Sequence, residues 1–119
     1  MRYMFLVKAA DNQGNPPPAL MEAMGQLIAK ATQAGTLVDT GGLEPLSTST
    51  RVRISGERIT VLDGPFSETK ELVGGYAIME LNSKEEAIAA AKDFLELHRT
   101  HWPGWEGESE IRQIFGPND

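Results

Sequence analysis

The chain has 119 residues, no cysteine, and 11 basic residues against 17 acidic ones, which gives a net charge of −6. This length fits one compact domain with its own core, so we expect a single domain over residues 1–119. The lack of cysteine excludes disulfides, thiolate catalysis and cysteine-based zinc or iron–sulfur sites. The acidic balance, with no local cluster of lysine and arginine, argues against nucleic acid as a partner.

The amino terminus opens with an apolar strand-like run, Tyr3 to Val7, which Lys8 ends. The run is too short for a signal-peptide core or a membrane span. We therefore expect a soluble cytoplasmic protein that does not associate with a membrane. A short, aromatic and unbroken apolar run of this kind predicts a buried strand.

Two segments carry helical patterns. The first follows three prolines, a composition that suits the start of a helix, and Gly35 is placed to end it. Its apolar residues recur at three- and four-residue spacing: Leu20, Met24, Leu27, Ile28 and Ala31. The second begins with a capping-box pattern, Ser83 with Glu86, and is expected to end near His98.

The remaining segments predict strands and one connector. Residues 36–46, which contain a glycine pair and a proline, are expected to form the connector. Residues 51–54 and 58–62 alternate in polarity around a short turn and predict a two-stranded ribbon. Two further strands are expected, at residues 76–81 and 111–115.

This order of elements predicts a ferredoxin-like α+β sandwich, with an antiparallel sheet that includes the ribbon and with both helices on one face. Residues 3–7 and 76–81 are nevertheless apolar on both faces of their strands. Two helices cover only one side of such a sheet, so the second face needs another cover. We therefore predict a homodimer whose sheets pack face to face.

The most distinctive segment runs from Asp63 to Tyr76 and reads Asp-Gly-Pro-Phe-Ser-Glu-Thr-Lys-Glu-Leu-Val-Gly-Gly-Tyr. It resembles the motif of the DGPF branch of the YCII-related proteins. Further segments match elements of that family: Tyr3-Met4-Phe5-Leu6, Gly41-Gly42-Leu43, Ser83 to Ala91 and Glu110-Ile111-Arg112. The resemblance covers nearly the whole chain, and it implies a dimeric α+β barrel in which two ferredoxin-like units pair through their sheets.

The resemblance also bears on activity. YCII-like proteins are similar to small cofactor-free enzymes, such as muconolactone isomerase-like proteins, and a histidine–aspartate pair has been proposed as the YCII active site. Many DGPF members instead look like companions of extracytoplasmic-function sigma factors. The chain has no histidine before His98, so the early histidine of the YCII pair has no counterpart.

Three residues of the motif are candidates for chemistry. A carboxylate at Asp63 would act as a general base if burial raised its pKa, whereas Asp-Gly-Pro is also a turn sequence in which the carboxylate accepts backbone hydrogen bonds. Lys70 would hold an anionic substrate, and Glu71 would transfer a proton of that substrate. The alternative is that both side chains lie on the surface in contact with water.

Further residues are candidates for substrate binding. Gly74, Gly75 and Tyr76 are three of them, and the two glycines would form a nest of amides for an anion, or else a β-bulge. Arg112 would clamp an anion on the face turned toward the second sheet, or else would form a salt bridge with Glu80.

The histidines and tryptophans after the second helix carry weaker patterns. His98 and His101 have a spacing that suits one helical face, but no third ligand is fixed, so we predict no metal site. A histidine interacting with the helix dipole is the favoured interpretation. Trp102 and Trp105 are expected to anchor the loop or a partner chain.

Two functions follow as hypotheses. The first is a small-molecule-binding dimer acting as a cofactor-independent lyase, isomerase or hydrolase on a small anionic organic substrate. The second is a non-catalytic ligand-sensing or accessory protein that works with an extracytoplasmic-function sigma factor. No metal, nucleotide or haem cofactor is implied by either.

Overall fold

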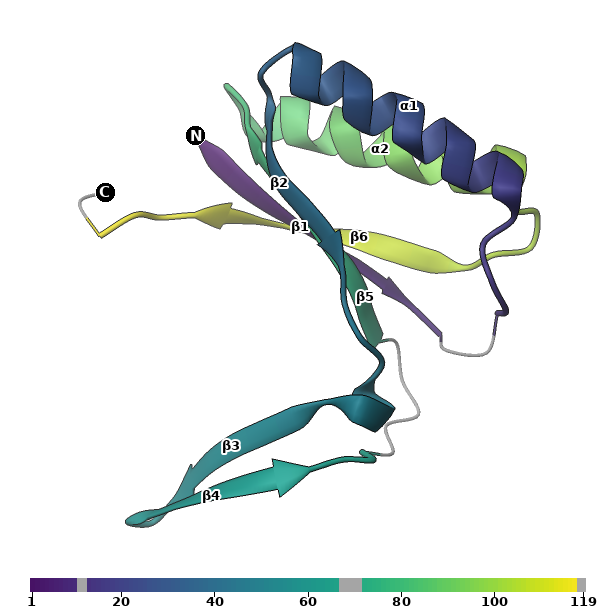
Figure 1. The fold of residues 1–119 in the computed structure, drawn as a ribbon. Coiled ribbons are helices and arrows are strands. Elements are labelled where there is room, and N and C mark those ends of the chain that lie inside the picture. The colour runs from purple at the N-terminus through teal and green to yellow at the C-terminus, as the bar shows by residue number, and fades with distance from the viewer. Residues whose placement is uncertain (11–12, 67–71, 118–119) are drawn as a thin grey trace.

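The computed structural model describes residues 1–10, 13–66 and 72–117, and combines two α-helices with six strands in these ranges (Figure 1). The elements in chain order are β1 (Arg2–Ala9), α1 (Pro18–Gln33), β2 (Leu37–Gly42), the 3₁₀ helix η1 (Leu46–Thr48), β3 (Thr50–Ser55), β4 (Arg58–Asp63), β5 (Leu72–Glu80), α2 (Lys84–His101) and β6 (Gly107–Ile114).

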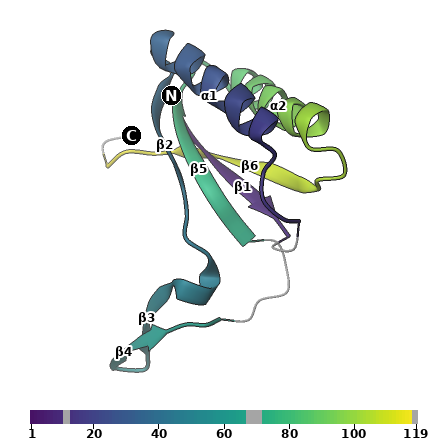
Figure 2. The ribbon, with the colours of Figure 1, turned by 45° about the vertical axis from the view of Figure 1, so that its right-hand side comes forward.

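Four of the strands form one antiparallel sheet in the order β2-β5-β1-β6, and both helices lie on the same face of it (Figures 1 and 2). This is the ferredoxin-like α+β arrangement that the sequence predicted. The core lies between sheet and helices, where Tyr3 and Phe5 of β1 pack with Ala87 and Ala91 of α2. Small alanines at these positions allow the helix to approach the aromatic rings closely.

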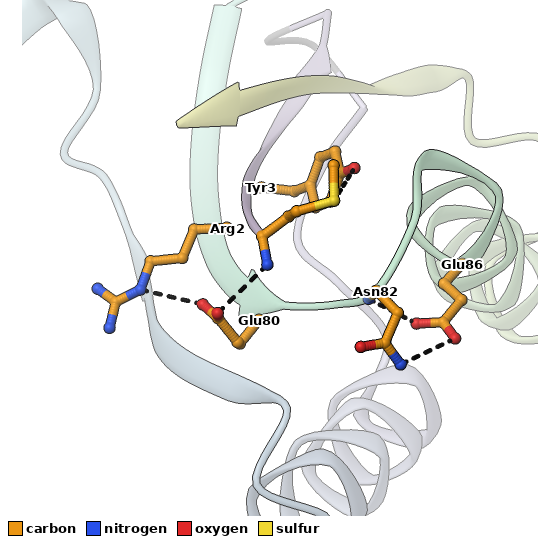
Figure 3. A network of polar contacts seen from close by, with 6 residues as sticks. Arg2, Tyr3, Glu80, Asn82 and Glu86 are labelled. Carbon is orange, nitrogen blue, oxygen red and sulfur yellow. Dashed lines mark hydrogen bonds and ion pairs between the residues drawn. The ribbon is translucent and has the colours of Figure 1, made fainter. Parts of the chain in front are cut away.

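Both helices begin and end largely as the sequence predicted. Ser83 Oγ accepts a hydrogen bond from the backbone amide of Glu86 at 3.2 Å. The Glu86 carboxylate in turn accepts one from the backbone amide of Asn82 at 2.9 Å (Figure 3). Helix α1 ends before Gly35, which has a φ of +76° that glycine adopts without strain. Helix α2 continues three residues beyond His98, and neither helix has the length and hydrophobicity needed to cross a bilayer.

The expectation for residues 36–46 was wrong, because they contain the edge strand β2 rather than only a connector. Strand β2 pairs with β5, and glycines on both strands allow the two backbones to approach closely. A Cβ added to Gly75 would lie 3.1 Å from the Gly41 carbonyl oxygen. Since β2 occupies this edge of the sheet, the predicted ribbon is excluded from it.

The ribbon instead forms a separate two-stranded sheet, the β3–β4 hairpin, and its predicted place in the main sheet was wrong. The hairpin projects on the side of the main sheet opposite the helices (Figures 1 and 2). The radius of gyration is 16.4 Å, whereas a compact chain of this length has about 13.5 Å. The projecting hairpin accounts for this extended shape.

Candidate functional site

The face of the main sheet turned away from the helices carries the candidate site, and we call it the open face. Because Tyr3 and Phe5 point into the core, alternation along β1 turns Met4 and Leu6 to the open face. Directly paired residues of antiparallel strands share a face, which extends the set to neighbouring strands. The open face comprises Arg2, Met4, Leu6, Lys8, Asp39, Val73, Tyr76, Ile78, Glu80, Glu108, Glu110, Arg112 and Ile114.

The middle of the open face is apolar. Met4 pairs with Ile78 of β5, and Leu6 pairs with Tyr76. All four side chains are half-buried by their neighbours within this chain. The predicted presence of apolar residues on both faces of β1 and β5 is thus confirmed.

A tyrosine–aspartate pair borders this apolar centre on one side. The Tyr76 hydroxyl donates a hydrogen bond to Asp39 Oδ2 at 3.0 Å, and the ring lies over Gly41. This hydrogen bond, followed by the negative charge of Asp39, raises the pKa of Tyr76 above its ordinary value. Tyr76 therefore keeps its proton at neutral pH and serves as a hydrogen-bond donor.

A cluster of three charged residues borders the centre on the other side. Glu110 accepts from Arg112 Nε at 2.9 Å and from Lys8 Nζ at 3.4 Å. The hydrogen bond from Arg112 lowers the pKa of Glu110, and Lys8 lowers it further. Burial has the opposite effect, but it is outweighed. The carboxylate stays ionised and is shared by the two cations. Glu108 lies directly opposite Lys8 on the same face, so two basic and two acidic residues meet along this border.

The salt bridge between Arg112 and Glu80, which was the alternative to an anion clamp, is not the one that forms, since Arg112 pairs with Glu110. Glu80 instead accepts from Arg2 Nε at 3.1 Å and from the amino group of Met1 at 3.3 Å (Figure 3). The strand register explains the difference, because it pairs Arg2 with Glu80 and sets Arg112 opposite Met4.

Asp63 is the last residue of β4, at the base of the hairpin that projects from the main sheet (Figures 1 and 2). Its Oδ1 accepts a hydrogen bond from the hydroxyl of Thr50 at 3.2 Å across the hairpin. The next residue, Gly64, donates its amide to the Ser49 carbonyl at 3.1 Å. A Cβ added to Gly64 would lie 3.0 Å from the Ser47 carbonyl oxygen, so a side chain here would require the backbone of η1 to shift.

The rest of the motif divides between described and undescribed residues. The guanidinium of Arg51 lies over the ring of Phe66, with its carbon Cζ 4.0 Å from the ring centroid. Gly74 is the extra residue at a register irregularity, since Val7 pairs with Gly75 and Lys8 with Val73. An extra residue on one strand of a pair is a β-bulge, which was the alternative to an amide nest for this glycine pair. The candidates Lys70 and Glu71 lie outside the described residues.

His98 lies in an aromatic cluster near the end of α2 and is only 6% exposed. The imidazole lies 4.6 Å from Phe94 and 4.3 Å from Trp105, measured between ring centroids, and Trp105 also approaches Trp102. Burial lowers the pKa of His98, against the effect of its hydrogen bond with the Phe94 carbonyl. The interaction of a histidine with the helix dipole stays a prediction, and the structure adds that His98 is buried among aromatic rings.

The cluster also borders a shallow hollow of about 540 Å³. Across the described ranges, no group of three or more histidine, cysteine or carboxylate side chains is placed to hold a metal ion.

Acidification is expected to destabilise the protein through His98. Its pKa is lowered on folding from an ordinary value of about 6.5, so the unfolded chain binds more protons between the two values. The free energy of unfolding should therefore be highest above about pH 6.5 and should fall as the pH drops below it. Urea unfolding at about pH 7.5 and about pH 5.5 measures this loss. A His98→Phe variant keeps an aromatic ring but has no group that titrates in this range, so its free energy of unfolding should fall less between the two pH values. An equal fall in the variant and the wild type would show that His98 is not the group responsible.

The sequence model of the YCII-related domain matches residues 1–95, from the first strand into α2. The chain belongs to the YCII-related family. The YCII-related match therefore includes β1, β2 and β5 of the open face, whereas the aromatic cluster from His98 onward and β6 with Arg112 lie beyond it.

A curated relative of this YCII-related chain is an uncharacterized protein of Rhizobium meliloti (strain 1021). It is 32% identical over 74 residues, which are 62% of this chain and 60% of the relative. The chain thus spans less than two thirds of that relative's length.

Sequence reasoning missed three residues of the site. Asp39 was hidden because the segment around the glycine pair gave no strand pattern. Lys8 and Glu110 were not considered as site residues, although strict alternation from Met4 and from Arg112 places them on the open face of the YCII-related sheet. That alternation was the available signal.

Proposed function

We propose that this YCII-related chain is a homodimer that binds a small organic anion between the open faces of its two sheets. The single observation behind the proposal is the composition of the open face. An apolar centre of Met4, Leu6 and Ile78 is bordered by hydrogen-bond donors and is not covered by either helix. Binding sites for small molecules combine an apolar lining with a few placed polar groups in this way.

The chemistry of the border suits a carboxylate. Arg112 uses Nε for Glu110, and within the described parts of the chain its two terminal nitrogens have no hydrogen bond or ion pair. A planar guanidinium with free terminal nitrogens binds a carboxylate through paired hydrogen bonds. Lys8, whose ammonium has three protons, adds donors at the edge of the same apolar centre. The hydrocarbon part of the anion would lie on Met4 and Ile78.

A second copy gives the site its cover. One sheet is an open surface, and a small ligand on it would stay largely in water. Pockets bury most of a ligand's surface. Two open faces packed together would enclose the ligand between two sets of donors, as in the dimeric barrel expected from the family resemblance.

Benzoate is the first probe, since it combines a carboxylate with an apolar ring. At one hundred times its Kd, a ligand adds about 2.7 kcal/mol to the free energy of unfolding and raises the melting temperature. Arg112→Gln is expected to remove most of this shift. The matched control is Arg99→Gln, because Arg99 is another exposed arginine paired with a glutamate, Glu96, on α2.

Equal benzoate shifts in the two variants would contradict the assignment of Arg112. Aliphatic dicarboxylates and small phosphates are tested in the same way to define the anion class. Unchanged recovery of these probes is expected, since they report binding; conversion of any of them to a product would add evidence for the enzyme hypothesis. An accessory role beside a sigma factor stays a prediction, and no observation on the open face favours it.

A further inference from the structure

We propose that the β3–β4 hairpin, residues 50–63, is a dimerisation arm that packs against a second copy of this chain beside that copy's open face. The proposal rests on the homodimer of the proposed function and adds a second contact to it. One side of the hairpin, the arm face, is formed by two directly paired sets, Val52 with Val61 and Ile54 with Ile59.

The arm face is strongly exposed within one chain. Its four β-branched side chains are between 66% and 71% exposed. An isolated two-stranded hairpin is marginally stable in water, and a contiguous apolar patch of this kind marks an interaction site. The hairpin therefore needs a partner surface to bury these side chains.

The exposed area of the chain matches that of a dimer subunit. Its accessible surface is 8587 Å². A compact monomer of 13.0 kDa exposes about 6,300 Å², which leaves an excess of about 2,200 Å² per chain. Obligate homodimer interfaces bury roughly 2,000 to 5,000 Å² in total, so burial of this excess on two chains falls within that range.

The direction of the hairpin favours a second copy over an unrelated partner. The hairpin projects on the side of the sheet that carries the open face (Figures 1 and 2). A second sheet seated on the open face would therefore lie next to the hairpin. The contact of the arm is then continuous with the sheet-to-sheet contact.

Charge favours the same occupant. Residues 50–63 hold three arginines against two acids, although the whole chain has a net charge of −6. The remainder of the chain accordingly holds eight basic and fifteen acidic residues, a net charge of −7. A basic hairpin and an acidic body are complementary between two copies, and complementary charge guides association.

The base of the hairpin gives a role to the Asp-Gly-Pro-Phe motif. Thr50 bonds Asp63 across the base, and Gly64 packs without a side chain on the carbonyl groups of η1. Arg51 stacks on Phe66 just beyond. These contacts join the first residues of the hairpin to η1, so the motif closes the hairpin on the segment that leads into it from β2.

Sedimentation equilibrium of an Ile54→Ser, Ile59→Ser double variant tests the arm. The Kd of the dimer is expected to rise at least about tenfold, because four exposed isoleucine side chains per dimer lose their apolar contact. The control is Met21→Ser, which removes an exposed apolar side chain from α1. A change of less than about twofold in the double variant, with folding confirmed by circular dichroism, would overturn the arm.

A photo-crosslinking amino acid at position 54 provides a second readout that does not depend on loss of stability. Crosslinks between two copies, mapped to residues of β1, β5 or β6, are expected. Crosslinks only within one chain, or in a lysate only to other proteins, would overturn the arm. A wild-type chain that sediments as a monomer would overturn both the arm and the dimeric site. An unchanged dimer that still binds benzoate in the double variant would overturn the arm alone.

Discussion

Replacing Met4 with lysine is expected to convert the protein into a folded monomer. Met4 lies in the apolar centre of the open face, between Ile78 and Arg112. In the proposed dimer a lysine here would be buried beside an arginine, and burial of an unpaired charge costs several kcal/mol. Two such sites per dimer should raise its Kd by more than about a thousandfold, since each 1.4 kcal/mol is a factor of ten. Sedimentation equilibrium measures the change.

The same substitution at Met21 is the matched control. Met21 is exposed on α1, on the far side of the sheet from the open face. Met21→Lys should dimerise like the wild type. Far-UV circular dichroism should show the same helix content in both variants, because Met4 is only half-buried within one chain. A Met4→Lys protein that dimerises with unchanged affinity would show that the sheets do not pack through their open faces.

The overall architecture was predictable because its main signals are local. Helix periodicity, the Ser83 cap and the two-faced alternation of residues 3–7 each depend on neighbouring residues. Together they predicted the sheet with two helices on one face and placed Arg112 on the other face. The register of β1 with β6 confirms that placement.

The position of the hairpin was not predictable from local signals. Residues 51–54 and 58–62 have a clear strand pattern, but alternation does not say which sheet a strand joins. That choice depended on β2, whose glycines weaken the strand pattern while they allow close pairing with β5. The competition between two segments for one sheet edge is settled by contacts distant in the sequence.

The candidate site was predictable in part for the same reason. Tyr76 and Arg112 lie on strands whose alternation is clear, and both fall on the open face. Asp39 lies on the strand that was taken for a connector, so its pairing with Tyr76 could not be foreseen. Asp63 attracted interest as a potential base, yet its visible contact, with Thr50, is at the base of the hairpin.

Replacing Phe5 with alanine is expected to lower the free energy of unfolding by about 3–5 kcal/mol. Phe5 is 5% exposed and packs against the alanines of α2, on the side of β1 opposite Met4. The loss combines the transfer of a buried ring with the cavity that remains, and a helix anchored on a sheet closes such a cavity only partly. Urea unfolding followed by far-UV circular dichroism measures it.

The comparison is cleanest in the Met4→Lys background, where the expected monomer removes the dependence of stability on protein concentration. Phe115→Ala is the matched control, because Phe115 is 71% exposed and its loss should change the free energy by less than about 0.5 kcal/mol. Equal effects at the two phenylalanines would contradict the assigned core. A large loss for Phe5→Ala in this monomer would show that the two sides of β1 have separate tasks: one holds the chain together, and the other remains available for a ligand and a second copy.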